Sequence, residues 1–261
     1  MVLSSGTAPK VTLRPLKASD VDAWRDARRR NAGWLSRWDA TAPPGADAKP
    51  VTFRTLIRRL TRSAKAGTTL PFAVEVNGAF AGQLTVNNIV RGSAQFASVG
   101  YWLDREYAGH GVMPRAVALA IDHCFLAVGL HRIEIAIRPE NSNSLRVVEK
   151  LEIPEVGYAP RFLHIDGDWR DHRLYAITKE DVPFGLLKRY EAQLAEDGGR
   201  PEAEQAEERG RRRSPDGGRG ARSASDVEPD GGRGARSASD VEPDGGRGAR
   251  SASDEPRDPA T

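Results

Sequence analysis

Apolar residues in the first 190 positions recur either at every second residue or at helical spacing, and these two periods predict short strands and helices. Strands are predicted over residues 10–16, 72–76, 80–86, 96–103, 133–137, 158–165 and 173–177. Helices are predicted over residues 19–30, 114–128, 144–151 and 182–195, with a further helix marked by Phe53, Leu56, Ile57 and Leu60. Ser19 and Asp22 form a capping-box pattern at the first helix, and residues 33–44 are predicted to be a loop.

The order of these elements predicts the fold class. Asn77-Gly78 lies between two strands and is typical of a two-residue β-hairpin. Strands and helices then alternate from residue 96 to residue 177. An antiparallel hairpin followed by such alternation predicts an α/β (α+β) domain, in which helices pack on a mixed sheet.

Residues 191–261 have a different composition from the rest of the chain. They contain 12 Arg, 17 Asp and Glu, no Lys and no aromatic residue, so all five Trp, five Tyr and seven Phe lie in residues 1–190. The unit PDGGRGARSASDVE starts at Pro215, repeats at Pro229 and returns in truncated form at Pro243. So little apolar surface does not offset the entropy lost on ordering. We therefore predict a flexible start over 1–9, one folded domain over 10–190 and a disordered tail over 191–261.

The charge divides in the same way. Residues 1–190 carry a net charge of +8 and residues 191–261 carry −5. A basic domain suits a polyanionic ligand, either a phosphorylated cofactor or nucleic acid, and the Arg-Gly content of the tail leaves weak RNA or ribosome contact open. No apolar run reaches the roughly 18 residues that a membrane span needs. We expect a soluble, cytoplasmic protein without membrane contact, either a monomer or a homodimer.

Cys124 is the single cysteine, which excludes a disulfide framework and a cysteine zinc site. It falls in the apolar part of a predicted helix, so a buried thiol is expected rather than a nucleophile. We predict no metal site.

Residues 101–116, YWLDREYAGHGVMPRA, combine a strand end, a Gly-x-Gly turn and a helix start. Glycine lets the backbone approach a ligand closely and adopt unusual dihedral angles. The backbone N–H groups of the turn are expected to converge at the positive end of the helix dipole and to form an anion site that suits a diphosphate. These N–H groups belong to Gly109, Gly111, Val112 and Met113. Three nearby cationic side chains could supplement the site: Arg105, His110 and Arg115.

Two other classes of phosphate site are excluded. A dinucleotide-binding Gly-x-Gly-x-x-Gly pattern fails at Pro114, and no acidic residue follows at the distance that this fingerprint requires. A Walker-type loop is absent because the chain has no Gly-Lys-Ser or Gly-Lys-Thr sequence.

A second informative segment, RPENSNSLRVVEKL, spans residues 138–151 directly after a predicted buried strand. Asn141 and Ser144 lie at the junction of this strand with the next helix. One of them, or Ser142, is expected to cap that helix, whatever other role the segment has.

These motifs together resemble the GNAT superfamily of N-acetyltransferases, and within it the RimJ/RimL branch of ribosomal-protein acetyltransferases. The resemblance rests on Gly-x-Gly after a strand and on Asn-x-x-Ser followed by Val-x-x-Lys-Leu about 30 residues later. TLRPLKASD at the start, LSRWDA in the early loop and FLHIDGDWRDHRLYAIT near the domain end support the branch. The resemblance covers roughly residues 10–182. The chain departs from the pattern at Glu106 and at Glu152-Ile153.

The resemblance implies a mostly antiparallel sheet with a splayed strand pair and helices on both faces. It also implies an acyltransferase that takes the acetyl group of acetyl-coenzyme A. The expected coenzyme-binding residues are the strand end Tyr101, Trp102 and Leu103, the turn Gly109, His110, Gly111, Val112 and Met113, and the helix start Asn141 and Ser144.

Acetyl transfer to an amine develops an oxyanion and then expels a thiolate. We expect the backbone N–H groups of residues 100–102 to stabilise the oxyanion and Ser144 to act as the acid. Glu155 is the first candidate for the base, and His164 and Asp171 are alternatives. An α-amine has a pKa of about 7.7–8.0, so an N-terminal acceptor could manage with ordered water instead.

Trp34 and Trp38 in the early loop could wall an apolar slot for the acceptor. The branch implies a protein N-terminal α-amine, as on a ribosomal protein. A small-molecule amine such as an aminoglycoside or a polyamine remains an alternative acceptor. A third possibility is a catalytically silent acyl-CoA sensor that binds RNA or the ribosome.

Overall fold

The computed structural model describes residues 1–6, 9–46 and 52–199 of the protein. Within these residues eight strands form one sheet in the order β1-β2-β3-β4-β5-β6-β8-β7. The strands are β1 (Leu3–Ser4), β2 (Val11–Pro15), β3 (Leu70–Val76), β4 (Ala79–Val90), β5 (Phe96–Leu103), β6 (Arg132–Ile137), β7 (Glu155–Ile165) and β8 (Asp168–Thr178). The α-helices are α1 (Val21–Arg30), α2 (Ala32–Leu35), α3 (Phe53–Lys65), α4 (Val112–Leu126), α5 (Ser142–Lys150) and α6 (Leu186–Gly199).

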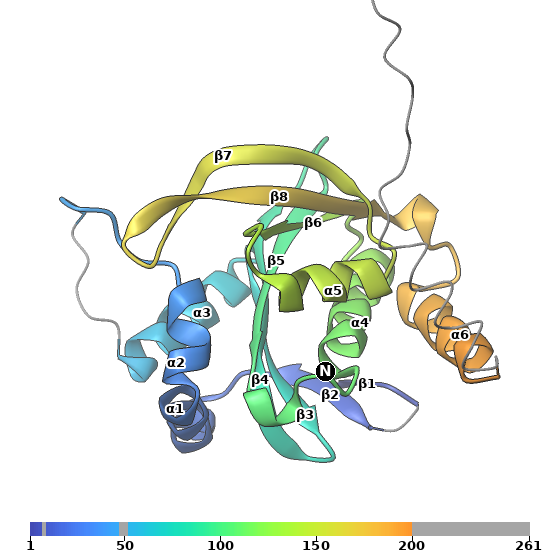
Figure 1. The fold of residues 1–261 in the computed structure, drawn as a ribbon, viewed down its shortest axis with the longest axis horizontal. Helices are drawn as coiled ribbons and strands as arrows, with labels where there is room; N and C mark the ends of the chain where they lie inside the picture. The colour runs from blue at the N-terminus through green and yellow to red at the C-terminus, as the bar shows by residue number, and fades with distance from the viewer. Residues whose placement is uncertain (7–8, 47–51, 200–261) are drawn as a thin grey trace, which may run out of the picture. The chain divides into compact units, whose positions relative to one another are not determined.

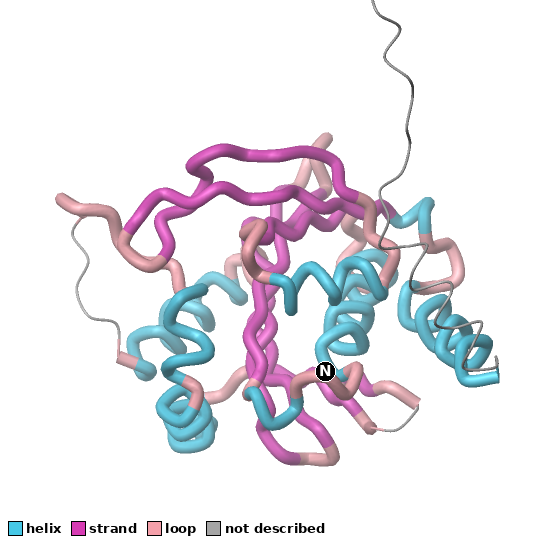
Figure 2. Tube along the Cα trace, viewed as in Figure 1, coloured by secondary structure: helices cyan, strands magenta, loops and turns pink. Residues whose placement is uncertain are grey.

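Helices cover both faces of the sheet, as predicted. α1, α2 and α3 lie on one side of the central strands, and α4, α5 and α6 lie on the other (Figure 1). Figure 2 shows the same layers, with cyan helices on both sides of the magenta strands. The larger apolar core lies on the α4 side, where eleven of the fifteen α4 residues are buried.

One strand pair departs from the antiparallel pattern of the sheet. β5 and β6 are parallel and pair over only three residues of each strand, from Phe96 opposite Arg132 to Ser98 opposite Glu134. β5 continues to Leu103 and β6 to Ile137 without further pairing between them. This confirms the predicted mixed, mostly antiparallel sheet with a splayed strand pair.

Local sequence explains two of the element boundaries. Asn77 and Gly78 both have positive φ, 49° and 87°, which is the backbone of the tight turn that Asn-Gly favours between twisted strands. Thr52 caps α3 by accepting a hydrogen bond from the amide of Thr55 at 3.2 Å.

Several predicted boundaries were wrong. Ser19 does not cap α1: a 3₁₀ turn, η1 (Ala18–Asp20), comes first, and the Asp20 carboxylate accepts from the amide of Lys17 at 2.7 Å. The predicted loop over 33–44 contains the end of α2 and a second 3₁₀ turn, η2 (Ser36–Trp38). The start predicted to be flexible contains β1, which pairs with β2.

α6 begins at Leu186, four residues later than predicted, and continues to Gly199. The reason is a cap supplied from α4, where the Asp122 carboxylate accepts from the amides of Leu186 at 2.6 Å and Leu187 at 3.0 Å. Residues 191–199 therefore belong to a helix. The remainder of the predicted tail, residues 200–261, lies outside the described residues.

Cys124 is fully buried in α4, and burial raises the pKa of its thiol to about 12. A thiol with so high a pKa is a poor nucleophile, which agrees with the expected structural role. Among the helices of the described residues, none has the length and apolar character that crossing a bilayer requires.

Arg14 joins β2 to its surroundings through two ion pairs. Its guanidinium contacts the carboxylate of Asp20 at 2.8 Å and that of Glu75 at 2.7 Å. Burial alone would raise the pKa of Asp20, but the hydrogen bonds from Arg14 and from the Lys17 amide outweigh it, so that pKa lies below its ordinary value. Asp20 therefore stabilises the fold in its ionised form.

Replacing Asp20 with Asn should lower the free energy of unfolding at pH 7 by about 2 kcal/mol, because a charge-assisted pair is lost. The depressed pKa means that this contribution is fully present above the unfolded-state pKa of about 3.9 and is lost as the pH falls through the folded-state value. Urea unfolding at pH 7 and pH 3 should show a gap between the two proteins that narrows at pH 3. Asp26→Asn, which removes an exposed pair with Arg29, is the control and should change stability by less than about 0.5 kcal/mol. Equal stability of Asp20→Asn and the parent protein at pH 7 would contradict this.

Candidate active site

A cavity of about 450 Å³ lies beside the splayed strands. Its lining comes from the second half of β5, the turn before α4 and the start of α5, with further residues from α2, η2, α3 and β4. Because β5 and β6 diverge, the main chain of β5 beyond Ser98 faces this space without partners from β6. The cavity therefore combines strand backbone, helix starts and apolar side chains.

The Gly-x-Gly turn has the conformation that an anion site needs. Gly109 and Gly111 have φ values of 88° and 70°, and Gly111 is the N-cap of α4. α4 thus begins at Val112, two residues earlier than predicted, so the amides of Val112 and Met113 lie in its first turn. First-turn amides lack partners within a helix and carry the positive end of its dipole. A diphosphate fits this turn.

A side chain at Gly111 would require the guanidinium of Arg115 to shift. A Cβ atom there would lie 2.6 Å from Nη1 of Arg115 and 3.3 Å from the hydroxyl of Tyr190. Arg115 is buried, donates to the carbonyl of Gly111 at 3.2 Å and lies 5.7 Å from the ring centre of Tyr190. α6 therefore supports the turn from behind through Tyr190, and a buried guanidinium places positive charge beneath the anion site.

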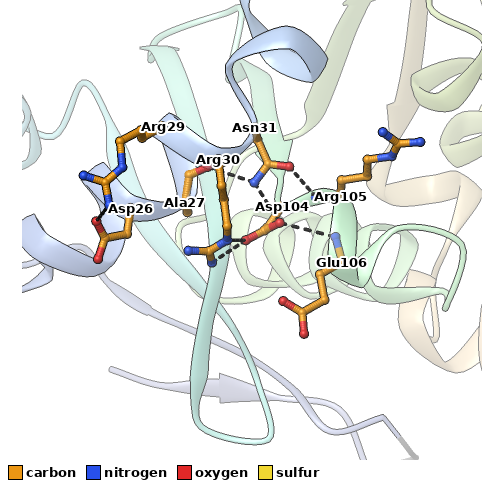
Figure 3. Close-up of polar contacts among 8 residues, drawn as sticks. All are labelled: Asp26, Ala27, Arg29, Arg30, Asn31, Asp104, Arg105 and Glu106. Atoms are coloured by element: carbon orange, nitrogen blue, oxygen red, sulfur yellow. Dashed lines mark hydrogen bonds and ion pairs between the residues drawn. The ribbon is translucent and has the colours of Figure 1, made fainter.

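A buried carboxylate ties the end of β5 to the end of α1 (Figure 3). Asp104 accepts from Arg30 Nε at 3.0 Å, from Arg30 Nη2 at 2.6 Å and from the side-chain amide of Asn31 at 2.7 Å. The side-chain oxygen of Asn31 in turn accepts from the backbone amide of Arg105 at 3.0 Å. This network fixes the start of the glycine turn relative to α2, which follows α1 directly.

α5 contributes two of the predicted residues. Asn141 caps the helix, and its side-chain oxygen accepts from the amide of Ser144 at 3.1 Å. Both residues line the cavity. Asn141 is therefore the residue that caps the helix, as expected for one residue of this segment. The cap fixes the backbone of Ser144 at the edge of the cavity.

Trp34 of α2 and Trp38 of η2 also line the cavity. The guanidinium of Arg105 lies 5.6 Å from the ring centre of Trp34. Two guanidinium groups contact Trp38, with that of Arg37 4.7 Å and that of Arg138 5.2 Å from the ring centre. Such cation–π contacts hold both rings in place as a wall.

Sequence reasoning missed a polar row on β4. Gln83, Thr85 and Asn87 line the cavity at every second position, while Leu84 and Val86 point into the core. Gln83 accepts from the indole N–H of Trp24 at 3.0 Å and donates to Thr85 at 3.1 Å. Polar residues alternating with apolar ones were the available signal, because alternate residues of a strand share a face.

The charged residues of the cavity were also missed. Arg59 of α3 and Arg146 and Lys150 of α5 line it, and the single carboxylate in its lining is that of Asp39, which is paired with Arg28. α3 has no acidic residue, and within the described part of the chain none of its cations forms an ion pair. These cations are Arg54, Arg58, Arg59, Arg62 and Lys65.

The remaining predicted residues lie elsewhere. Glu155 is at the start of β7, where its carboxylate accepts from Arg173 at 2.9 Å, and it does not line the cavity. His164 is buried against Thr41, 2.8 Å from its hydroxyl, and Asp171 accepts from the Tyr158 hydroxyl at 2.6 Å. Neither lines the cavity, and His110 is an exposed residue of the turn outside its lining. The structure therefore brings none of the three candidate bases into the cavity.

No group of three or more His, Cys, Asp and Glu side chains in residues 1–6, 9–46 and 52–199 is arranged to hold a metal ion.

Comparison with known proteins gives a consistent family. The profile described as "Acetyltransferase (GNAT) domain" matches residues 10–153. The [ribosomal protein uS5]-alanine N-acetyltransferase of Escherichia coli is 30% identical over 166 residues, which cover 62% of this chain and 85% of that protein. The probable N-acetyltransferase YjcK of Bacillus subtilis is 40% identical over 100 residues, 38% of this chain and 55% of YjcK.

The solved structure of Mycobacterium smegmatis RimJ in complex with CoA-disulfide is similar in both sequence and fold. It aligns with a TM-score of 0.68 at 36% identity, and the alignment covers 74% of this chain and 94% of that one.

Gly111→Ala should weaken coenzyme A binding by at least about tenfold, because the new Cβ displaces Arg115 and the turn. Isothermal calorimetry measures this directly. Gly129→Ala is the matched control: φ is 75° there and no atom lies within 4 Å of the added Cβ. Gly129→Ala should lower the free energy of unfolding by about 1–2 kcal/mol, as expected for alanine at a positive φ, and should keep the parent affinity for coenzyme A. Unchanged affinity in Gly111→Ala would contradict the placement of the diphosphate.

Proposed function

We propose that this chain, which belongs to the GNAT acetyltransferase family, acetylates the α-amino group of a protein N-terminus, as in the RimJ/RimL branch. It is an N-acetyltransferase that takes its acetyl group from acetyl-coenzyme A. The observation that carries the proposal is the cavity beside the splayed strands, which is lined by the glycine turn at Gly111 and by Trp34 and Trp38.

Main-chain groups supply the anchoring on the donor side. The bound coenzyme supplies a thioester carbonyl that an amine can attack. The amides of Gly111, Val112 and Met113 hold the diphosphate, and the β5 backbone from Gly100 to Trp102 faces the carbonyl and stabilises negative charge on its oxygen. Ser144 donates a hydrogen bond to the sulfur as it leaves.

The base in this proposal is ordered water, since the structure places Glu155, His164 and Asp171 outside the cavity lining. An α-amine with a pKa of about 7.7–8.0 is roughly one quarter neutral at pH 7.3, whereas a lysine side chain with a pKa of about 10.4 is about one thousandth neutral. A site without a dedicated base therefore favours an α-amine over a lysine.

The charges at the cavity favour a peptide over a polycation. Arg59 faces the acceptor side, and the carboxylate of Asp39 is neutralised by Arg28. The positive charge of Arg59 would repel polycations such as spermidine and aminoglycosides. The polar row Gln83, Thr85 and Asn87 offers donors and acceptors to an extended peptide backbone.

The name of the Escherichia coli relative points to a ribosomal protein as acceptor, and such an acceptor places the reaction in the cytoplasm. The five cations of α3 suit contact with ribosomal RNA near that acceptor.

Thiol release from acetyl-CoA, followed with a panel of acceptors, tests the acceptor class. Peptides with a free α-amine should be used with at least tenfold higher kcat/KM than the same peptides blocked at the N-terminus and carrying one lysine, which is the direction that the neutral fractions predict. Spermidine and kanamycin should be poorer still. A preference for spermidine would move the assignment to small-molecule amines, and no thiol release with any acceptor would favour the sensor alternative.

Ser144→Ala should lower kcat by at least about tenfold with little change in KM for acetyl-CoA, because the donor to the departing sulfur is lost. Ser142→Ala, in the same turn of α5 and outside the cavity lining, is the control and should retain the parent rate. A full rate in Ser144→Ala would end the proposed role of this hydroxyl.

A further inference from the structure

The hydroxyl of Tyr101 is buried and has no hydrogen-bond partner within the described part of the chain. The residue lies in the part of β5 that lines the cavity, and its ring packs against the main core. A buried polar atom without a partner destabilises a fold, so native proteins rarely keep one without a use. Phenylalanine would fill the same space without that penalty.

Tyr101 and Ser144 both line the cavity. The two residues approach from opposite sides of the splay, Tyr101 from β5 and Ser144 from the helix that follows β6. Burial raises the pKa of Tyr101, and the nearby Ser144 hydroxyl opposes that rise. The two hydroxyls are therefore neighbours, although they do not form a well-aligned hydrogen bond in the structure.

We propose that Tyr101 is a positioning residue for acetyl transfer: its phenolic O–H donates to Ser144 Oγ, so that the Ser144 O–H is directed at the departing sulfur. The inference rests on the proposed role of Ser144. No covalent bond or proton transfer is required of Tyr101, which keeps its proton because its pKa is raised. Hydrogen bonds in such a chain polarise and strengthen one another.

This inference differs from the expected backbone role of Tyr101. The backbone of residue 101 serves the coenzyme with any side chain, whereas the proposal concerns the phenolic oxygen alone. If the ring only fills space, removing its hydroxyl should leave kcat unchanged. If the hydroxyl orients Ser144, the same substitution should lower kcat.

In the absence of coenzyme, Tyr101→Phe should raise the melting temperature or leave it unchanged, because the buried Tyr101 hydroxyl has no well-aligned partner in the structure. The same variant should lower kcat roughly fivefold to tenfold, with no change in KM for acetyl-CoA or in the Kd of coenzyme A measured by calorimetry. Tyr175→Phe, at another buried tyrosine outside the cavity lining, is the matched control and should retain the parent kcat.

A double-mutant cycle with Ser144→Ala completes the test. If Tyr101 acts through Ser144, adding Tyr101→Phe to Ser144→Ala should cause no further loss of rate. Full kcat in Tyr101→Phe, additive losses in the cycle, or a weakened Kd for coenzyme A would each overturn the proposal.

Failure of the acceptor assignment is distinguishable from failure of this inference. If the parent protein does not use N-terminal peptides, the acceptor proposal fails, and the cycle is measured with the amine that is acetylated. If Ser144→Ala slows the reaction while Tyr101→Phe does not, only the role of Tyr101 fails.

Discussion

β5 and β6 pair over only three residues of each strand, and the rest of the site depends on the space that their divergence opens. A fully paired sheet would bury the backbone of residues 99–103 in ladder hydrogen bonds and leave no entry between the strands. Divergence instead turns this backbone toward the cavity, where α5 approaches from the β6 side. The sheet thereby supplies both the scaffold and the reactive surface of the site.

Two buried supports keep this open arrangement rigid. Asp104 joins the end of β5 to α1 and therefore to the tryptophan wall. Arg115 and Tyr190 hold the glycine turn from the side of α4 and α6. The donor end and the acceptor end of the cavity thus share one framework, so that a thioester and an amine meet at a fixed geometry.

Much of the fold could be predicted because its signals are local: strand alternation, Asn77-Gly78 and the glycine turn. The residues that join distant segments carried no such signal. Asp104 accepts a hydrogen bond from Asn31, which lies 73 positions earlier in the chain, and nothing near Asp104 in the sequence indicates that contact. Glu155 is a similar case, because its carboxylate accepts from Arg173 on the neighbouring strand β8 and does not line the cavity. The sequence shows that the α3 segment is rich in arginine, but it does not show that Arg59 lines the cavity.

The central claim is that main-chain amides between the splayed strands and at the start of α4 hold the coenzyme. A crystal structure of the protein soaked with coenzyme A tests it most directly. The account predicts density for the diphosphate against the amides of Gly111, Val112 and Met113, and for the pantetheine arm along residues 99–103. Density for the diphosphate at any other surface, with the splay left empty, would contradict it.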